Sequence, residues 1–263
     1  MSSLSGKRFL VTGAASGIGD ATARQLVNAG VSVVSLDRNT PTAPVDQHIT
    51  VDLSDPDSID AALAQLDGTF DGLLSIAGVP GTAPADVVFA VNALGMRHVV
   101  ESSLGLLNPG AAVVVVSSTA GYNWADRLET IKELLATDTF AEGADWFTAN
   151  PQEGNAYNFS KEVATVYVMT MGIALHEMGL RINAVLPGPV QTPILEDFRK
   201  SMGEDTIDGV ETLLGRHATP DDIASVILFL ASPEAGWVNG HALVVDGGLS
   251  GTVLTGLVPV PEI

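Results

Sequence analysis

The sequence has no cysteine, few basic residues and no long apolar run, and each absence excludes a class of protein. Without cysteine, the chain has no disulfide bonds and no thiolate metal site. Its 12 lysines and arginines stand against 31 aspartates and glutamates, and this net charge of −19 repels the phosphates of nucleic acids. No apolar run approaches the roughly 20 residues of a membrane span, and no apolar segment precedes a cleavage site at the N-terminus. We therefore expect a soluble, cytoplasmic protein that binds neither nucleic acid nor a membrane.

Metal chemistry and serine hydrolysis are also disfavoured. The histidines show no two-histidine ligand spacing, so no metal is expected, and we interpret all five as surface or sheet-edge residues: His48, His98, His176, His217 and His241. A serine hydrolase would need a Gly-x-Ser-x-Gly turn. The serine of AASGIG lies inside a glycine loop instead.

What the chain does have is a regular alternation of apolar and helical segments. Short runs rich in valine, isoleucine and leucine are typical of buried strands, at residues 8–13, 31–37, 71–78, 111–118, 181–188 and 241–248, with a further strand around TVDLSD (50–55). Helical spacing covers residues 18–30, 58–67, 85–107 and 220–233. This alternation, without a linker, predicts one α/β domain over residues 1–263, built as a doubly wound parallel sheet with helices on both faces. Ligands bind such sheets at the carboxyl ends of the strands.

A glycine-rich loop follows the first strand. VTGAASGIG places Gly13, Gly17 and Gly19 between strand and helix, where a pyrophosphate can approach the backbone N–H groups of the helix N-terminus. Asp37 ends the second strand, close to the roughly 20-residue spacing expected for a carboxylate that binds ribose hydroxyls. The alternative is that the glycines make only a tight connection and that Asp37 only begins a turn before Pro41.

The acidic residue also indicates which nicotinamide cofactor binds. A carboxylate at Asp37 can accept a hydrogen bond from a free ribose 2′-hydroxyl and would repel a 2′-phosphate, so NAD is favoured over NADP. Arg38 could instead receive the phosphate, and whether it relaxes the preference stays open. Asp52 and Leu53, at the end of the third strand, would lie beside the adenine.

Seven motifs in order make the chain similar to the short-chain dehydrogenases/reductases. They are TGAASGIG, SIAG (Ser75–Gly78), VNALG (Val91–Gly95), SS (Ser117–Ser118), YNFSK (Tyr157–Lys161), RINAVLPGPVQTP (Arg181–Pro193) and VVDGG (Val244–Gly248). The resemblance covers residues 11–248 and implies a Rossmann-type fold, alcohol–ketone interconversion, and a homodimer or homotetramer. One departure is SIAG itself, which replaces the Asn-Asn-Ala-Gly common in the family at a position that supports the sheet and does not react.

The resemblance also implies which residues form the site. The catalytic set is Ser118, Tyr157, Lys161 and Asn92. The cofactor-binding set is Gly13, Ser16, Gly17, Ile18, Gly19, Asp37, Asp52, Leu53, Ala77, Gly78, Tyr157, Lys161, Pro187, Gly188, Val190 and Thr192.

These residue types suit a hydride transfer accompanied by a proton transfer. A phenol normally ionises near pH ~10, and a neighbouring ammonium favours the phenolate. Tyr157 and Lys161 stand four residues apart, so they are neighbours on one helix face. Ser118 would bind and orient the substrate oxygen, and Asn92 would hold a water or backbone group that links Lys161 to solvent. Taken singly, a helix-face pair and a strand-end serine also have ordinary structural explanations.

Two segments are expected beside the substrate. We interpret residues 122–154 as a helical insertion near the substrate cleft (the insertion), with one or two helices that place Leu128, Ile131, Leu134 and Leu135 on one side. The insertion would shape substrate access or an oligomer interface. Residues 193–215 would form a substrate lid (the lid). This loop pattern resembles that of the bacterial 3α-hydroxysteroid dehydrogenase/carbonyl reductase subgroup.

The apolar side chains of both segments allow two interpretations. They could form an apolar wall for a bulky substrate, or they could only pack onto the body of the protein. The side chains concerned are Ile194, Leu195, Phe198 and Met202 in the lid and Trp124, Trp146 and Phe147 in the insertion.

Together these observations predict an NAD(H)-dependent oxidoreductase with Tyr157 as acid and base. The substrate would be a bulky, hydrophobic secondary alcohol, such as a hydroxysteroid, cyclic or aryl alcohol, and the product its ketone. Two alternatives stay open: an NADPH-dependent carbonyl or acyl-thioester reductase, and a non-catalytic NAD(H)-sensing binding protein. The sequence leaves stereochemistry, physiological direction and the choice between dimer and tetramer open.

Overall fold

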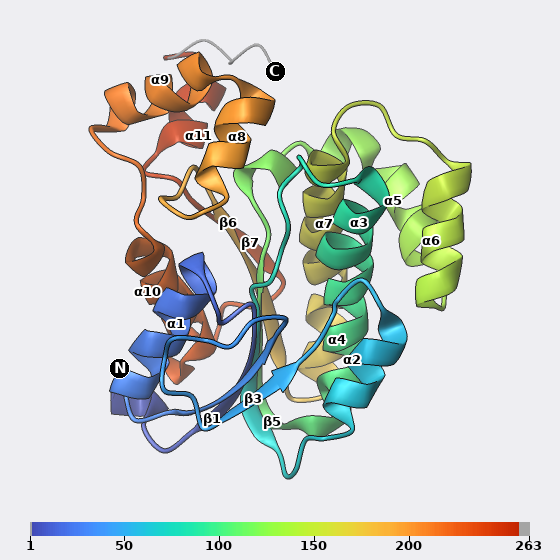
Figure 1. Cartoon of the computed structure of the whole chain (residues 1–263), viewed down its shortest axis with the longest axis vertical. Coiled ribbons are helices and arrows are strands. Elements are labelled where there is room, and N and C mark those ends of the chain that lie inside the picture. Colours follow the sequence, from blue (N-terminus) through green and yellow to red (C-terminus); the bar gives the residue numbers. More distant parts are fainter. Residues whose placement is uncertain (1, 258–263) are drawn as a thin grey trace.

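A sheet of parallel strands runs through the molecule (Figure 1). The computed structural model describes residues 2–257, apart from the side chains of residues 2, 201, 202 and 204–206. The strands are β1 (Arg8–Thr12), β2 (Ser32–Asp37), β3 (Gln47–Thr50), β4 (Phe70–Ser75), β5 (Leu107–Val116), β6 (Arg181–Pro187) and β7 (His241–Val245). Their order is β3-β2-β1-β4-β5-β6-β7. The strand order reverses between β1 and β4, and ligands bind open α/β sheets at such a switch point. The predicted doubly wound sheet is confirmed.

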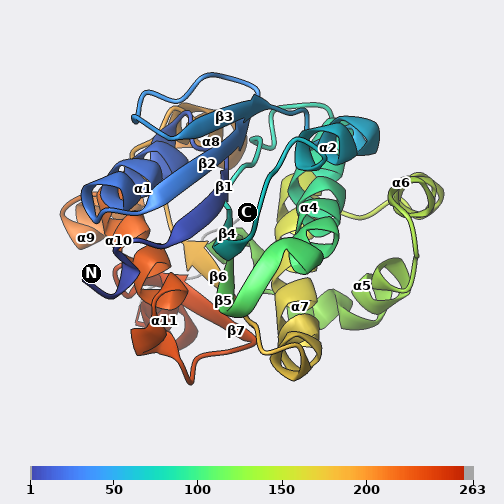
Figure 2. The same cartoon turned by 90° about the horizontal axis from the view of Figure 1, so that it is seen from below.

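Helices cover both faces of this sheet (Figure 2). One face carries α1 (Gly17–Asn28) and α10 (Pro220–Ala231), and the other carries α2 (Pro56–Leu63), α4 (Met96–Ser103) and α7 (Ala156–Glu177). The other α-helices are α3 (Ala85–Phe89), α5 (Leu128–Leu135), α6 (Phe140–Ala149), α8 (Leu195–Met202), α9 (Glu204–Leu214) and α11 (Leu249–Leu254). A π-helical segment, Ala90–Gly95, joins α3 to α4.

Alternate side chains of each strand pack on opposite faces of the sheet. Phe9 and Val11 of β1 belong to the core under α1 and α10, whereas Leu10 between them belongs to the core under α2, α4 and α7. All three side chains are fully buried. Burying an aliphatic or aromatic side chain of this size stabilises the fold by about 1.5–3 kcal/mol. Two buried faces explain why the strands are continuous apolar runs instead of alternating ones.

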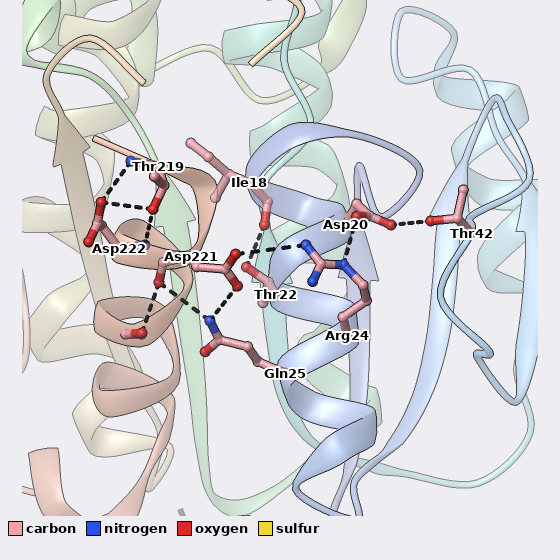
Figure 3. Close-up of polar contacts among 10 residues, drawn as sticks. Ile18, Asp20, Thr22, Arg24, Gln25, Thr42, Thr219, Asp221 and Asp222 are labelled. Carbon is pink, nitrogen blue, oxygen red and sulfur yellow. Dashed lines mark hydrogen bonds and ion pairs between the residues drawn. The ribbon is translucent and has the colours of Figure 1, made fainter. Parts of the chain in front are cut away.

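Polar contacts fix how α1 and α10 lie side by side (Figure 3). Gln25 Nε2 donates to Asp221 Oδ1 at 2.9 Å, and Arg24 Nη2 lies 4.0 Å from the other carboxylate oxygen of Asp221. Thr219 begins α10 with a capping box, in which its Oγ1 accepts from Asp222 N and Asp222 Oδ2 accepts from Thr219 N. Exposed pairs of this kind stabilise little by themselves. They align α1, whose N-terminus reaches the switch point, against the neighbouring helix.

The third strand ends earlier than the sequence predicts. It stops at Thr50, so Asp52 and Leu53 lie in the turn that follows instead of in the strand. The carboxylate of Asp52 accepts hydrogen bonds from Ser54 N at 2.9 Å and Ser54 Oγ at 2.7 Å. Such a side-chain-to-backbone bond closes a turn, and Asp55 then caps α2.

Within residues 2–257, no helix has both the length and the apolar character required to cross a membrane. The predicted cytoplasmic location and the predicted homodimer or homotetramer stay predictions.

Candidate active site

A cleft opens at the carboxyl ends of β1, β2, β4, β5 and β6 and extends to α8. All residues that the sequence places around the cofactor line this cleft, and so does Ser118. Asn92 is the exception among the predicted site residues, because it does not line the cleft. Residues from both halves of the chain therefore meet at the edge of the sheet where the fold places a ligand.

The glycine loop is shaped by close contact between backbone segments. A Cβ on Gly19 would lie 1.9 Å from the carbonyl oxygen of Gly13, and a Cβ on Gly13 would lie 2.7 Å from the backbone of Ala77. Neither position has room for a side chain. Ser16 is the N-cap of α1, so the loop turns the free N–H groups of the helix N-terminus toward the cleft. This is the geometry that favours a pyrophosphate.

Asp37 lies at the end of β2 and is held by two backbone amides. Its Oδ2 accepts from Ala15 N at 3.0 Å and its Oδ1 accepts from Asn39 N at 2.9 Å. An ionised carboxylate has about four acceptor positions, so Asp37 retains the capacity to accept from ribose hydroxyls. Asn39 also lines the cleft, and the sequence analysis missed it because its contribution is a backbone amide.

Arg38 and Asp52 bring opposite charges to the same end of the cleft. Hydrogen bonds from Ser54 lower the pKa of Asp52, and the charge of Arg38 contributes to the lowering. Arg38 therefore faces a carboxylate that is ionised at neutral pH.

Thr12 binds the backbone of the SIAG motif. Its fully buried hydroxyl oxygen accepts from Ile76 N at 3.0 Å and from Ala77 N at 3.2 Å. These bonds hold the chain leaving β4 against the end of β1. Thr12 was not among the predicted site residues, because nothing in a strand pattern distinguishes a threonine that bonds its neighbouring strand from one that only packs.

The end of β5 and the start of α7 bring together the side chains that the sequence predicts to be catalytic. Ser118 follows β5, and its Oγ accepts from Ala120 N at 3.1 Å. Asn155 caps α7 by accepting from Tyr157 N at 2.7 Å, which places Tyr157 in the first turn. One turn later, Lys161 Nζ lies 5.6 Å from the centroid of the Tyr157 ring and donates to Val116 O at 3.0 Å.

Burial changes the proton affinity of both groups. Tyr157 is 9% exposed, and burial raises its pKa to about 12, while a side-chain hydrogen bond with Ser118 acts in the opposite direction. Lys161 is 4% exposed, and burial lowers its pKa to about 8. The site therefore holds a protonated phenol next to an amine that releases its proton more readily than usual. Positive charge beside Tyr157 would favour its ionised form.

Ser117 ties the two elements to each other. Its Oγ donates to the carbonyl oxygen of Lys161 at 2.8 Å and lies 3.0 Å from Thr165 Oγ1. A Cβ on Gly121 would lie 2.5 Å from the same carbonyl oxygen, so the chain after β5 runs directly against α7. The serine pair thus has two functions, although the sequence analysis assigned a role only to Ser118.

Asn92 holds the loop behind the cleft. It lies in the π-helical segment. Such segments are rare in proteins, and many of those that occur are at functional sites. Its Oδ1 accepts from Val79 N at 2.8 Å and its Nδ2 donates to Val79 O at 3.0 Å. Asn92 thus binds a backbone group, which is one of the two partners predicted for it. The link from Lys161 to solvent stays a prediction.

The insertion forms helices, but its residues do not line the cleft. Leu128, Ile131, Leu134 and Leu135 of α5 pack in one apolar cluster, in agreement with their predicted place on one side of the helix. The ring of Phe147 in α6 stacks on that of Phe89 in α3, with 3.9 Å between centroids. Figure 1 shows α5 and α6 on the far side of α3 and α7 from α8.

The aromatic residues of the insertion therefore pack onto the body of the protein. Trp146 stacks on Phe159 of α7 with 6.3 Å between ring centroids, and Trp124 packs in the same cluster. The interpretation of these residues as a substrate wall is wrong. The reason is that α3 and α7 present an apolar surface of their own, which α5 and α6 cover.

The lid contributes directly to the cleft. Ile194 and Phe198 line it, whereas Leu195 does not, and the side chain of Met202 lies outside the described residues. The ring of Phe198 contacts that of Tyr157 edge-on, with 5.2 Å between centroids and 67° between planes. Thr82 Oγ1, from the loop after β4, donates to Asp197 Oδ1 at 2.9 Å and joins α8 to the opposite side of the cleft.

His217 differs from the surface position predicted for it. The side chain is 2% exposed, and its Nε2 lies 3.6 Å from Glu211 Oε2. The next residue, Ala218, accepts a hydrogen bond from Gln191 N at 2.8 Å, so the segments on the two sides of the lid meet next to His217. Among the described side chains, no group of three or more could hold a metal ion.

Comparison with known proteins agrees with the motif-based resemblance. The short chain dehydrogenase model matches residues 7–127, and the model described as enoyl-(acyl carrier protein) reductase matches residues 147–250. The chain is 39% identical to coniferyl-alcohol dehydrogenase of Pseudomonas sp. (strain HR199 / DSM 7063), over 95% of this chain and 98% of that protein. It is 34% identical to 3-alpha-hydroxysteroid dehydrogenase/carbonyl reductase of Comamonas testosteroni, over 92% and 95% of the two chains.

A solved structure gives the same result. The 3-alpha-hydroxysteroid dehydrogenase from Pseudomonas sp. B-0831, complexed with NADH, superposes with a TM-score of 0.79 at 30% identity. The match covers 96% of this chain and all of the other. The bound NADH of that relative agrees with the cofactor predicted from the sequence.

The buried amine predicts a specific pH dependence of stability. Between pH 8 and 10.5, the unfolded chain keeps the proton of Lys161 while the folded protein loses it, so the free energy of unfolding rises with pH in this window. The rise is on the order of 3 kcal/mol, because one pKa unit corresponds to about 1.4 kcal/mol. Urea unfolding at several pH values should show this rise in the wild type and lose it in Lys161→Met. Lys132→Met, which removes an exposed lysine, should leave the rise intact. Equal pH slopes in all three proteins would contradict the assignment.

Proposed function

Because the chain belongs to the short-chain dehydrogenase/reductase family, we propose that it is an NAD(H)-dependent oxidoreductase that interconverts an alcohol and its carbonyl compound. The observation that carries the proposal is the meeting of Ser118, Tyr157 and Lys161 in one cleft with the glycine loop and Asp37. The glycine loop leaves no room for side chains and exposes the N-terminus of α1, which fits a dinucleotide.

Each catalytic side chain has a distinct task. When bound, the nicotinamide cofactor supplies the acceptor or donor of a hydride. The Ser118 hydroxyl binds the substrate oxygen and orients it. Tyr157 Oη takes the hydroxyl proton when the alcohol is oxidised and gives a proton to the carbonyl oxygen in the reverse direction. The Lys161 ammonium stabilises the phenolate and so offsets the effect of burial on Tyr157.

The cofactor assignment to NAD rests on charge. Asp37 lines the cleft and is held there by two amides, and its charge disfavours a 2′-phosphate. The relative complexed with NADH supports this assignment. Arg38, which lines the same end of the cleft, could instead receive a 2′-phosphate and so favour NADPH, and the C-terminal half of the chain matches a model described as a reductase. An NADPH-dependent carbonyl or acyl-thioester reductase is therefore the second candidate.

The substrate is a bulky, hydrophobic alcohol. Ile194, Phe198 and Val79 give the substrate end of the cleft an apolar lining. The relatives are named for coniferyl alcohol and for hydroxysteroids, which both carry a hydroxyl group on a ring-bearing hydrocarbon skeleton. Coniferyl alcohol carries its hydroxyl on a primary carbon, so the predicted restriction to secondary alcohols needs its own test.

The proposed function is tested by following NADH formation from NAD at mildly alkaline pH with a panel of alcohols. The panel contains steroid, monoterpene and aryl secondary alcohols, primary aryl-allylic alcohols and short aliphatic alcohols. We expect turnover with bulky members and little with aliphatic ones, because only bulky substrates cover the apolar lining. Absence of turnover across the panel with intact NADH binding would favour the non-catalytic binding protein.

Tyr157→Phe should lower kcat by roughly a hundredfold or more, because it removes the group that transfers the proton. NADH affinity should stay within a few-fold of the wild type. Tyr167→Phe is the matched control, since Tyr167 is a second buried tyrosine of α7 that does not line the cleft. Steady-state kinetics and fluorescence titration with NADH measure both effects. A Tyr157→Phe variant with most of its activity would refute the acid/base role.

Asp37→Asn should reduce the preference for NAD. The substitution keeps an acceptor oxygen but removes the charge, so NADH affinity should fall roughly tenfold, as expected for charge-assisted hydrogen bonds. NADPH affinity should rise. Titration of the wild type and of Asp37→Asn with NADH and with NADPH gives the ratio of the two affinities for each protein. A wild type that binds NADH and NADPH equally well would contradict the role of Asp37.

A further inference from the structure

One arginine joins the insertion to the catalytic helix. Arg127 stands where the insertion enters α5, and its Nε and Nη2 donate to the two carboxylate oxygens of Glu162 in α7 at 2.7 and 2.8 Å. Its Nη1 donates to the carbonyl oxygen of Glu153, at the end of the insertion, at 3.0 Å. The guanidinium of Arg127, near the start of the insertion, therefore binds both the end of the insertion and α7.

This contact is largely buried and depends on the shape of the guanidinium. Glu162 is 4% exposed, and the guanidinium carbon of Arg127 lies 5.0 Å from the centroid of the Phe159 ring. Removal of the partner of a buried carboxylate strongly destabilises the folded protein, because the remaining charge is left uncompensated. Lysine cannot replace the planar fork or its bidentate bond. The pair is thus specific for arginine.

The two residues that Arg127 holds bracket the catalytic side chains in the sequence. Glu153 precedes Asn155, whose side chain caps α7 at Tyr157 N, and Glu162 directly follows Lys161. The first two turns of α7 are therefore held at both ends. Neither Arg127 nor Glu162 lines the cleft.

We propose that Arg127 is a positioning residue of the active site, through which the insertion sets the place of Tyr157 and Lys161 relative to Ser118. Without the fork, the start of α7 is free to shift away from the end of β5, and the hydrogen bond between Ser118 and Tyr157 lengthens. The proposal rests on the proposed function. It assigns the insertion a role in the site, although the insertion contributes no side chain to the cleft.

The test compares Arg127→Lys with Arg181→Lys. Arg181 is a matched control because its guanidinium also donates three hydrogen bonds, to the carbonyl oxygens of Leu230, Ser232 and Val238, but it stands at the opposite end of β6 from the cleft. The kinetics use the best alcohol of the panel, well below the melting temperature of both variants.

We expect kcat of Arg127→Lys to fall about tenfold, with the NADH Kd within about threefold of the wild-type value. The pH of half-maximal kcat should rise, since the Ser118 bond that lowers the pKa of Tyr157 weakens. Arg181→Lys should lose stability but keep its kcat within twofold.

Hydrogen exchange supplies a readout that does not depend on turnover. Amides of residues 153–162 should exchange faster in Arg127→Lys, while those of the glycine loop should not change. If the wild type shows no turnover, the proposed function fails, and the exchange of this segment still decides the positioning claim.

Two results would overturn the proposal. One is an Arg127→Lys variant whose kcat, pH profile and exchange match those of the wild type or of Arg181→Lys. The other concerns Arg127→Met/Glu162→Leu, which removes the buried charges together and should fold even if Arg127→Lys does not. Since Glu153 is no longer held in this double variant, its kcat should still fall, and a wild-type kcat would show that the pair is only structural.

Discussion

The contact between the end of β5 and α7 is the constraint on which the active site depends. Ser117 bonds the carbonyl oxygen of Lys161, and Gly121 passes so close to this oxygen that a side chain would not fit. These contacts place the residue after Ser117 beside the first turn of α7. The chain between the two elements can consequently leave the site and return, because its two ends are held. An insertion at this point lengthens the sequence between the catalytic residues without separating them in space.

Burial changes the pKa values of the two side chains that α7 brings to the cleft. The same loss of water raises the pKa of the Tyr157 phenol to about 12 and lowers that of the Lys161 amine to about 8. A neutral phenol suits proton donation to a carbonyl oxygen, whereas proton removal from an alcohol requires positive charge beside the ring. Lys161, 5.6 Å from the ring centroid, is the cation that the described residues place there. In the proposed mechanism, the direction of proton transfer thus depends on the charge beside Tyr157 as well as on the phenol itself.

The lid and the insertion, the two segments added to the core of sheet and helices, differ in what they contribute to the site. The lid places Ile194 and Phe198 in the cleft and brings an aromatic edge onto Tyr157. The insertion packs against α3 and α7 and contributes no described residue to the cleft. In the proposed function, the lid therefore contacts the substrate, whereas the insertion acts through the position of α7.

The sequence by itself determined the fold class, the glycine loop, Asp37 and the pairing of Tyr157 with Lys161. These features follow from local rules, because strand ends, helix N-termini and a four-residue helical spacing are set by residues adjacent in the chain. Only the tertiary structure decided that Asn92 bonds Val79 behind the cleft, that Thr12 binds the backbone of Ile76, that His217 is buried and that Arg127 binds Glu162. Each of these depends on which surfaces meet when distant segments pack. No periodicity records such a meeting, since the same side chain can pack, bond or face water according to its neighbours in space.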